Sequence, residues 1–71
     1  MAVFTSAAIT LRKKLIIDAL RDSGATSPET AKTLAEAGVG KPDLFPEYTE
    51  KLVYLGLINE TADGKYWTDA D

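Results

Sequence analysis

The sequence contains no cysteine and no histidine among its 71 residues. These two absences exclude disulfide bonds, the commonest kinds of zinc site and the usual pairs of nucleophile and base. A domain of this size must therefore be held together by apolar packing, and a hydrophobic content of 45% suffices for one small core. The lack of cysteine also fits a reducing compartment, so we expect a cytoplasmic protein.

Long hydrophobic runs are also missing, and no stretch reaches the roughly 18 apolar residues that a membrane span requires. The first residues, MAVFTSAAITLRKK, place their charges after the apolar part. A secretory signal carries its basic residues before that part, so this stretch is interpreted as the start of a helix. The alternative is the remnant of a membrane segment, which would make the chain a soluble appendage of a membrane protein.

The net charge of −3 is unevenly distributed along the chain. Residues 1–21 contain four basic residues and one acid, which gives +3, whereas residues 22–71 contain four lysines and ten acids, which gives −6. An acidic second part works against a phosphate-bearing partner.

A first helix is predicted from Thr5 or Ser6, either of which can cap it, to about Ser23, with Gly24 ending it. At about 100° per residue, most of its apolar residues share one arc. These are Ala8, Ile9, Leu15, Ile16, Ala19 and Leu20. Arg12 lies inside this arc, so either its stem runs along the edge of the core or its guanidinium pairs with a nearby acid.

A second, short helix is predicted after the stretch GATSPE and before Gly38. Two signals mark its start: Thr26 with Glu29 has the spacing of a capping box, and Ser27 places Pro28 at the first helical position.

A third helix is predicted to start between Pro42 and Pro46, because proline is tolerated only in a first turn, and to end at Gly56. Its apolar residues fall on one arc, as a helix facing a core requires. The core predicted from the whole chain includes Ile9, Leu15, Ile16, Leu20, Leu34, Phe45, Tyr48, Leu52, Leu55 and Ile58.

The stretches LINET, ADG and KYWTD predict a strand, a turn and a strand. Asp-Gly is a strong hairpin signal because both turn positions tolerate positive φ. If Asp63 and Gly64 form a two-residue turn, Glu60 faces Trp67, and a longer loop shifts this register.

The order of these elements resembles the winged-helix superfamily over about residues 7–68. The most specific piece is LVYLGLINETADGKYW, which is similar to the end of a recognition helix followed by a β-wing. Gly56 lets the chain reverse, and Leu57 and Ile58 then reach the core. The resemblance implies one α+β domain over residues 1–71, a three-helix bundle with a small antiparallel β-hairpin wing. Winged helices bind DNA, RNA and proteins, so the fold does not decide the function.

In DNA-binding winged helices, the exposed face of the third helix enters the major groove and the wing contacts phosphates. The residues predicted on that face here are Glu47, Glu50, Lys51 and Tyr54. Arginine, asparagine and glutamine, which recognise base edges, are absent from it. The wing has Lys65, but also Glu60 and Asp63, so nucleic acid is disfavoured by charge.

We therefore expect a small non-catalytic module that binds another protein or domain. The candidate partner-binding residues are Glu47, Glu50, Lys51, Tyr54, Lys65 and Trp67. Exposed aromatic side chains anchor many protein interfaces, and one of the two wing aromatics is expected to point outward. The alternative is a winged-helix transcriptional regulator that binds DNA with an atypically acidic recognition helix.

A basic patch is predicted on the first helix at Lys13, Lys14 and Arg21. It is either a solvated helix face, with Lys14 and Asp18 satisfying each other, or a site for an acidic partner such as the acidic part of a second copy in a homodimer.

No enzyme chemistry or cofactor site is predicted. Asp63, Asp69 and Asp71 lack the spacing of a Ca²⁺-binding loop, and no glycine-rich phosphate loop is present.

Overall fold

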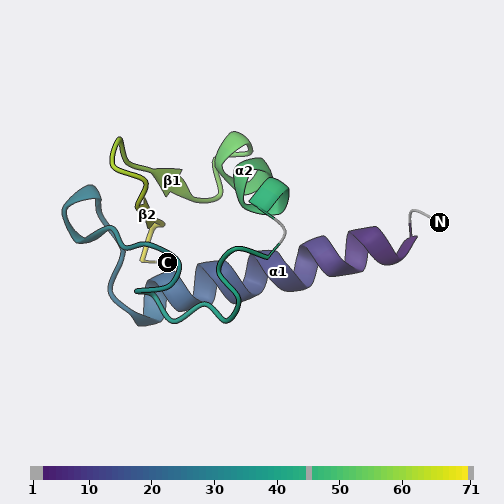
Figure 1. Ribbon diagram of the computed structural model, residues 1–71. Coiled ribbons are helices and arrows are strands. Elements are labelled where there is room, and N and C mark those ends of the chain that lie inside the picture. The colour runs from purple at the N-terminus through teal and green to yellow at the C-terminus, as the bar shows by residue number, and fades with distance from the viewer. Residues whose placement is uncertain (1–2, 45, 71) are drawn as a thin grey trace.

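The computed structural model describes residues 3–44 and 46–70, with side chains described from residue 10 onward. Its elements, in chain order, are helix α1 (Val3–Asp22), the 3-10 turn η1 (Pro28–Thr30), helix α2 (Pro46–Tyr54), and strands β1 (Asn59–Glu60) and β2 (Tyr66–Trp67). Within the described residues the protein is thus a small α+β structure with two α-helices and one antiparallel hairpin (Figure 1).

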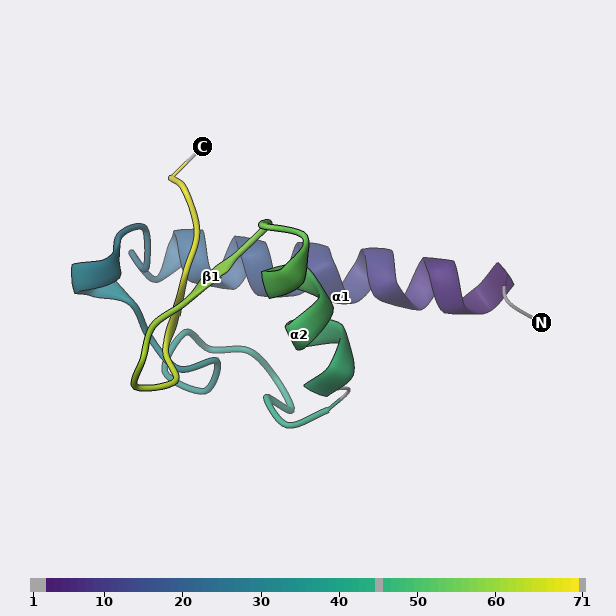
Figure 2. The ribbon, with the colours of Figure 1, turned by 90° about the horizontal axis from the view of Figure 1, so that it is seen from above.

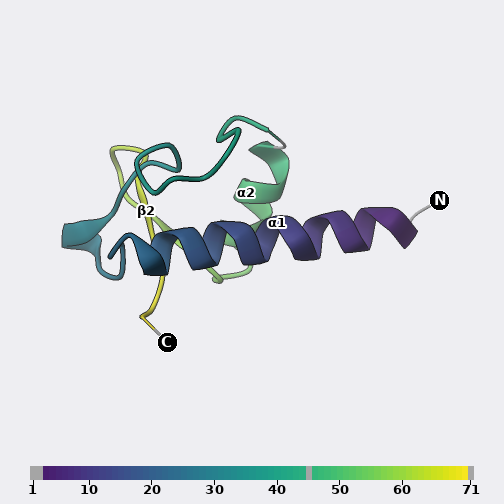
Figure 3. The ribbon, with the colours of Figure 1, turned by 90° about the horizontal axis from the view of Figure 1, so that it is seen from below.

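Helix α1 is the longest element, and the rest of the chain packs against its C-terminal part. Figures 1, 2 and 3 show α2, the hairpin and the segment between the helices gathered along this part, while the N-terminal part of α1 extends past them. The molecule is accordingly elongated, with dimensions of 40 × 23 × 20 Å.

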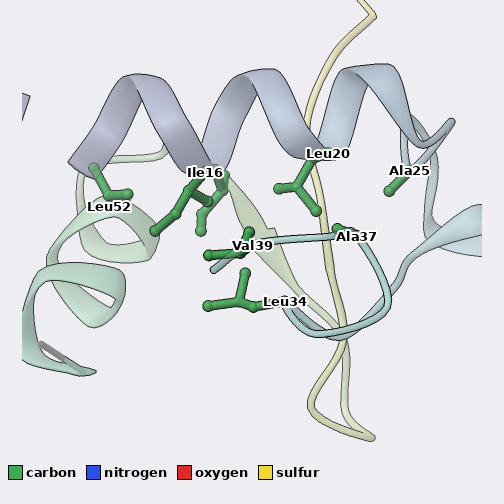
Figure 4. Packing of buried hydrophobic residues seen from close by; sticks show 8 residues of the cluster. Ile16, Leu20, Ala25, Leu34, Ala37, Val39 and Leu52 are labelled. Carbon is green, nitrogen blue, oxygen red and sulfur yellow. The ribbon is translucent and has the colours of Figure 1, made fainter. Parts of the chain in front are cut away.

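The hydrophobic core lies between α1 and the segments packed on it (Figure 4). The buried apolar residues are Ile16, Leu20, Ala25, Leu34, Ala37, Val39, Leu52 and Ile58. The predicted core is confirmed at Ile16, Leu20, Leu34, Leu52 and Ile58. Ala25, Ala37 and Val39 were not predicted, because each lies in a segment without a long apolar period.

Two of the predicted core residues are wrong. Leu15 is 45% exposed and Leu55 is 55% exposed. The buried stripe of α1 runs through Arg12, Ile16 and Leu20, four residues apart, so Leu15 lies beside this stripe and not within it. Tyr48 is half-buried. The side chains of Ile9 and Phe45 lie outside the described part of the chain.

Three segments end with the same sequence pattern. In each, a leucine is followed by any three residues, then by a glycine and then by an apolar residue. In each, the apolar residue's N–H donates to the leucine carbonyl, and the glycine N–H donates to the carbonyl of the residue after the leucine. This pair of bonds is a Schellman motif, which requires positive φ at the glycine. The motifs are Leu20–Ala25 with Gly24 at φ 85°, Leu34–Val39 with Gly38 at φ 89°, and Leu52–Leu57 with Gly56 at φ 78°.

The predicted second helix is wrong. Between Gly24 and Gly38 the chain forms η1, a β-bridge at Lys32 and then a single turn at residues 33–38. The predicted start with Ser27 as cap and Pro28 at the first helical position is confirmed, but it begins only η1. A capping box also begins the turn: the Thr33 N–H donates to Glu36 Oε1 at 3.0 Å, and the Glu36 N–H donates to Thr33 Oγ1 at 3.1 Å. The start signal that caps the turn thus comes seven residues later than the one at Thr26.

Lys32 joins the hairpin as a third pairing partner, opposite β1. Its N–H donates to the Tyr66 carbonyl at 2.9 Å, and the Tyr66 N–H donates to the Lys32 carbonyl at 2.7 Å. Strand β2 is therefore paired on both edges, with β1 on one side and the Lys32 bridge on the other. This pairing explains why the chain is extended at residues 31 and 32, between η1 and the turn, and does not continue as a helix.

The hairpin is confirmed, but its register is shifted by one residue from that of a two-residue turn. Asn59 faces Trp67 and Glu60 faces Tyr66. The loop has three residues, because the Thr61 N–H donates to the Lys65 carbonyl at 2.8 Å. Gly64, at φ 81°, takes the left-handed position that such a loop requires.

Arg12, which lies within the apolar arc of α1, adopts neither of the two arrangements predicted for it, a stem along the edge of the core or an ion pair with an acid. Its side chain is 7% exposed. The guanidinium donates to three backbone carbonyls, those of Gly40 at 3.3 Å, Lys41 at 3.0 Å and Leu44 at 3.1 Å. Arg12 thereby ties α1 to the irregular segment that leads into α2, and it sets where α2 starts.

Candidate functional site

The exposed face of α2 carries the residues that were predicted on it. Glu47, Glu50, Lys51 and Tyr54 are all exposed. Their spacing of three and four residues places them on one side of the helix, opposite the buried Leu52. Two carboxylates against one ammonium leave this face acidic, and Glu47 and Lys51 complement the helix dipole at its two ends.

The C-terminal end of α2 exposes apolar side chains close together in the sequence. Tyr54 is 87% exposed, Leu55 is 55% exposed, and Leu57 is 38% exposed. Single exposed apolar residues are normal on a protein surface, but clustered ones mark interaction sites. We call these three residues the apolar tip of α2.

A cleft of about 520 Å³ adjoins the acidic face. Four parts of the chain form its walls: the turn at 33–35, the segment that leads into α2, the helix itself, and the end of the hairpin. The lining residues that matter for its chemistry are Asp43, Thr49, Glu50, Gly64 and Tyr66. The cleft thus lies where the candidate helix face meets the wing.

The phenol of Tyr66 reports the electrostatics of this cleft. Burial raises the pKa of the Tyr66 hydroxyl above its ordinary value, and the carboxylates of Glu60 and Glu50 raise it further. Both carboxylates therefore lie near the hydroxyl and disfavour a second negative charge there. The cleft is consequently an acidic site in which Tyr66 stays neutral.

Thr49 is the least expected member of the cleft wall. It is 4% exposed, and within the described residues its Oγ1 has no hydrogen-bond partner. An unsatisfied buried hydroxyl costs about 1–3 kcal/mol, so native structures rarely keep one without a reason. The spacing signal for its burial was present in the sequence, since Thr49 lies three residues before Leu52.

The wing residues Lys65 and Trp67 differ in what they face. Lys65 is half-buried next to Gly64, and its Nζ lies 4.0 Å from Asp63 Oδ2, beside the cleft. Trp67 packs against the hydrophobic core. Tyr66 does so as well, so both wing aromatics are partly buried, and the expectation that one points outward is wrong. Strand β2 has α1 and η1 as neighbours, and Tyr66 also lines the cleft.

The basic patch on α1 is partly engaged within the chain. Lys14 Nζ lies 3.0 Å from Asp18 Oδ2 in an exposed i, i+4 ion pair. The Nε of Arg21 donates to the Asp69 carbonyl at 2.9 Å. Lys13 is half-buried. Two of the three cations thus already serve local structure.

Neither a metal centre nor a membrane span is found in the part of the chain that the structure describes. No three acidic side chains there come close enough to hold an ion. Of the predicted aspartate trio, Asp71 lies outside the described residues. The helices at residues 3–22 and 46–54 lack the length or the apolar content that crossing a bilayer demands.

Comparisons with protein-family models, curated proteins and solved structures gave no match for this chain.

Of the five cleft residues named above, only Glu50 was among the predicted candidates. Asp43, Thr49, Gly64 and Tyr66 were missed. Tyr66 is placed by its bridge to Lys32, for which the local sequence carries no signal.

Proposed function

We propose that this chain is a non-catalytic interaction module of shortened winged-helix type that docks on another protein through α2. In this view the Lys32 bridge corresponds to the first strand of a winged helix, and the turn at 33–38 occupies the place of its second helix. The hairpin is the wing, and α2 corresponds to the recognition helix.

The observation that carries the proposal is the pairing of an acidic helix face with the apolar tip. Tyr54, at 87% exposure, holds a large ring in solvent at the end of this helix. Tyrosine is enriched at the centres of protein interfaces because it buries much area with little loss of entropy. Phosphate groups would be repelled by Glu47 and Glu50, so a polypeptide suits this surface better than DNA.

Affinity capture from a lysate of the source organism, with the wild type and a Tyr54→Ser variant, tests the proposal. We expect a partner protein that the wild type retains and Tyr54→Ser loses. Leu11→Ser is the matched control, because Leu11 is 70% exposed on α1, away from α2, and its substitution should leave the capture unchanged. Equal capture by both variants would rule out the apolar tip as the docking surface.

Fluorescence anisotropy with generic duplex DNA tests the alternative. The proposal expects no binding at low salt. A complex that weakens steeply as salt rises, and that is lost when Lys13 and Lys14 are changed to alanine, would instead establish a DNA-binding regulator.

A further inference from the structure

The size of the cleft beside α2, its acidic lining and the hydroxyl of Thr49, unpaired among the described residues, together define what kind of group it would bind. It is open to solvent on one side and is large enough for a ligand, since binding clefts in proteins span roughly 300–1,000 Å³. Its walls come from segments far apart in the sequence, such as the turn that begins at Thr33 and the hairpin that contains Tyr66. It is therefore a product of the tertiary structure and not a groove along one helix.

The charged groups that line the cleft are all acidic. Asp43 and Glu50 line it, and Glu60 lies close enough to raise the pKa of the Tyr66 hydroxyl. No lysine or arginine belongs to its described wall. Lys65 is the basic residue at the end of the hairpin, and its Nζ lies 4.0 Å from the carboxylate of Asp63. The lining of the cleft is thus acidic, with Lys65 beside it and not in its wall.

The hydroxyl of Thr49 supplies an independent indication of a ligand. Thr49 lines the cleft, is 4% exposed, and has no partner for its Oγ1 among the described residues. A hydroxyl oxygen carries two lone pairs that can accept from a donor in the cleft. Because Oγ1 is itself shielded from solvent, it meets such a donor only after turning about χ1. Threonine populates two χ1 rotamers in helices, which gives Oγ1 the freedom to turn toward such a donor.

We propose that this cleft binds an arginine side chain of the partner protein, with Asp43, Glu50 and the Thr49 hydroxyl accepting hydrogen bonds from the guanidinium. Tyr66 also lines the cleft, and an aromatic ring there would attract a cation that comes over its face. This inference rests on the proposed docking of α2 on a protein, and it adds the chemistry of the group that enters the site.

Arginine fits this site better than lysine does. A guanidinium has five donors in a planar fork, so one side chain can reach two carboxylates and a hydroxyl at once. It also stacks on aromatic rings and is less strongly hydrated than an ammonium, which lowers the cost of entering a partly enclosed cleft.

The test uses a blocked hexa-arginine peptide as the probe, titrated into ¹⁵N-labelled protein and followed by NMR chemical shifts. We expect saturable shifts concentrated at the amides of Thr49, Glu50, Gly64 and Tyr66. A hexalysine peptide should bind about three- to tenfold more weakly, because it lacks the planar fork. Hexacitrulline, which keeps the shape and removes the charge, should cause no saturable shift.

Matched variants separate the cleft from the general acidity of the protein. Glu50→Gln and Thr49→Val should each weaken hexa-arginine binding about three- to tenfold. Glu29→Gln is the control, because Glu29 is an exposed acid in η1 that does not line the cleft, and it should change the affinity by less than about twofold. The thermal unfolding of each variant shows that the fold is retained.

Equal losses for Glu29→Gln and Glu50→Gln, or shifts spread over all acidic residues, would overturn the inference, as would unchanged binding by Thr49→Val. None of these results touches the proposed function, which depends on capture through Tyr54. Conversely, binding to duplex DNA would refute the proposed function. The binding of arginine by the cleft would still be tested by the peptide titration and its variants.

Discussion

The turn at residues 33–38 and the segment from Pro46 to Leu57 end in the same motif but differ greatly in helical length. Each finishes with a buried leucine, a glycine with positive φ and an apolar residue that returns to the leucine carbonyl. The first contains a single turn, whereas the second contains the nine residues of α2.

The difference comes from where each segment starts. Thr33 and Glu36 form a capping box only five residues before Gly38, which leaves room for one turn. Pro46 starts α2 ten residues before Gly56. The comparison teaches that the distance between the start and stop signals sets the helix length, even where the stop signals are alike. A glycine stop by itself predicts an end but not a helix.

The largest expected effect comes from the leucines of the two stop motifs. Leu34→Ala and Leu52→Ala should each destabilise the protein by about 2–5 kcal/mol, because each leaves a cavity under a buried side chain. Urea unfolding measures the change. Leu55→Ala is the matched control on the same helix, and it should cost about 1 kcal/mol or less since Leu55 is mostly exposed. A small loss at Leu34 alone would show that the single turn contributes little to the core.

A smaller loss of stability is expected from substitution of Arg12, which donates to carbonyls of residues 40–44, between the turn at 33–38 and α2. Arg12→Met keeps most of the apolar stem and removes three hydrogen bonds from a charged donor, so it should cost about 2 kcal/mol in urea unfolding. Arg12→Lys keeps the charge without the fork and should recover only part of this loss. Lys14→Met, at an exposed position of α1, provides the reference. Equal stability of Arg12→Met and Lys14→Met would refute the role of Arg12 as a tie.

The two stop glycines test whether the short turn is held as firmly as α2. Gly38→Ala and Gly56→Ala should each cost about 1–2 kcal/mol, since an alanine at positive φ is strained. No neighbouring atom lies within 4 Å of a Cβ at either site, so strain and not collision accounts for the loss. Thermal unfolding of the two variants gives the comparison. A negligible cost at Gly38 would mean that residues 33–38 close without the Schellman motif.

The smallest expected effect is the pH dependence of the capping box. The backbone N–H of Thr33 donates to the carboxylate of Glu36 and lowers its pKa below the ordinary value, with Lys65, the Thr33 side chain and Lys32 acting in the same direction. The folded-state pKa is therefore below the unfolded-state value. The stability that this carboxylate contributes is present above the unfolded-state pKa, roughly 4.3, and is lost as the pH falls through the folded-state pKa.

Glu36→Gln should consequently show a shallower loss of stability on acidification than the wild type, measured by thermal unfolding across this pH range. A ¹³C titration of the Glu36 carboxyl provides the direct reading. Titration at or above the ordinary glutamate pKa would contradict the capping box in solution.

Much of the fold could be predicted from residues close together in the sequence. The apolar arc of residues 8–20 and Gly24 predicted the first helix and its end, Pro46 and Gly56 predicted the limits of α2, and Asp63-Gly64 predicted the hairpin. These features are local because helix caps and turns are made by residues within one or two turns of one another. The acidic, exposed face of α2 followed from the same spacing.

Only the tertiary structure decided which local signals were used. Lys32 pairs with Tyr66, thirty-four residues away, and this pairing limits the preceding stretch, which carries two helix-start signals, to the three residues of η1. Arg12 is buried because three carbonyls of a distant segment accept its hydrogen bonds. The cleft, with Thr49 in its wall, exists because the turn at 33–35, the segment before α2, the helix and the end of the hairpin come together around it. In each case a buried backbone or side-chain group must find its partner across the chain, and that partner cannot be identified from neighbouring residues.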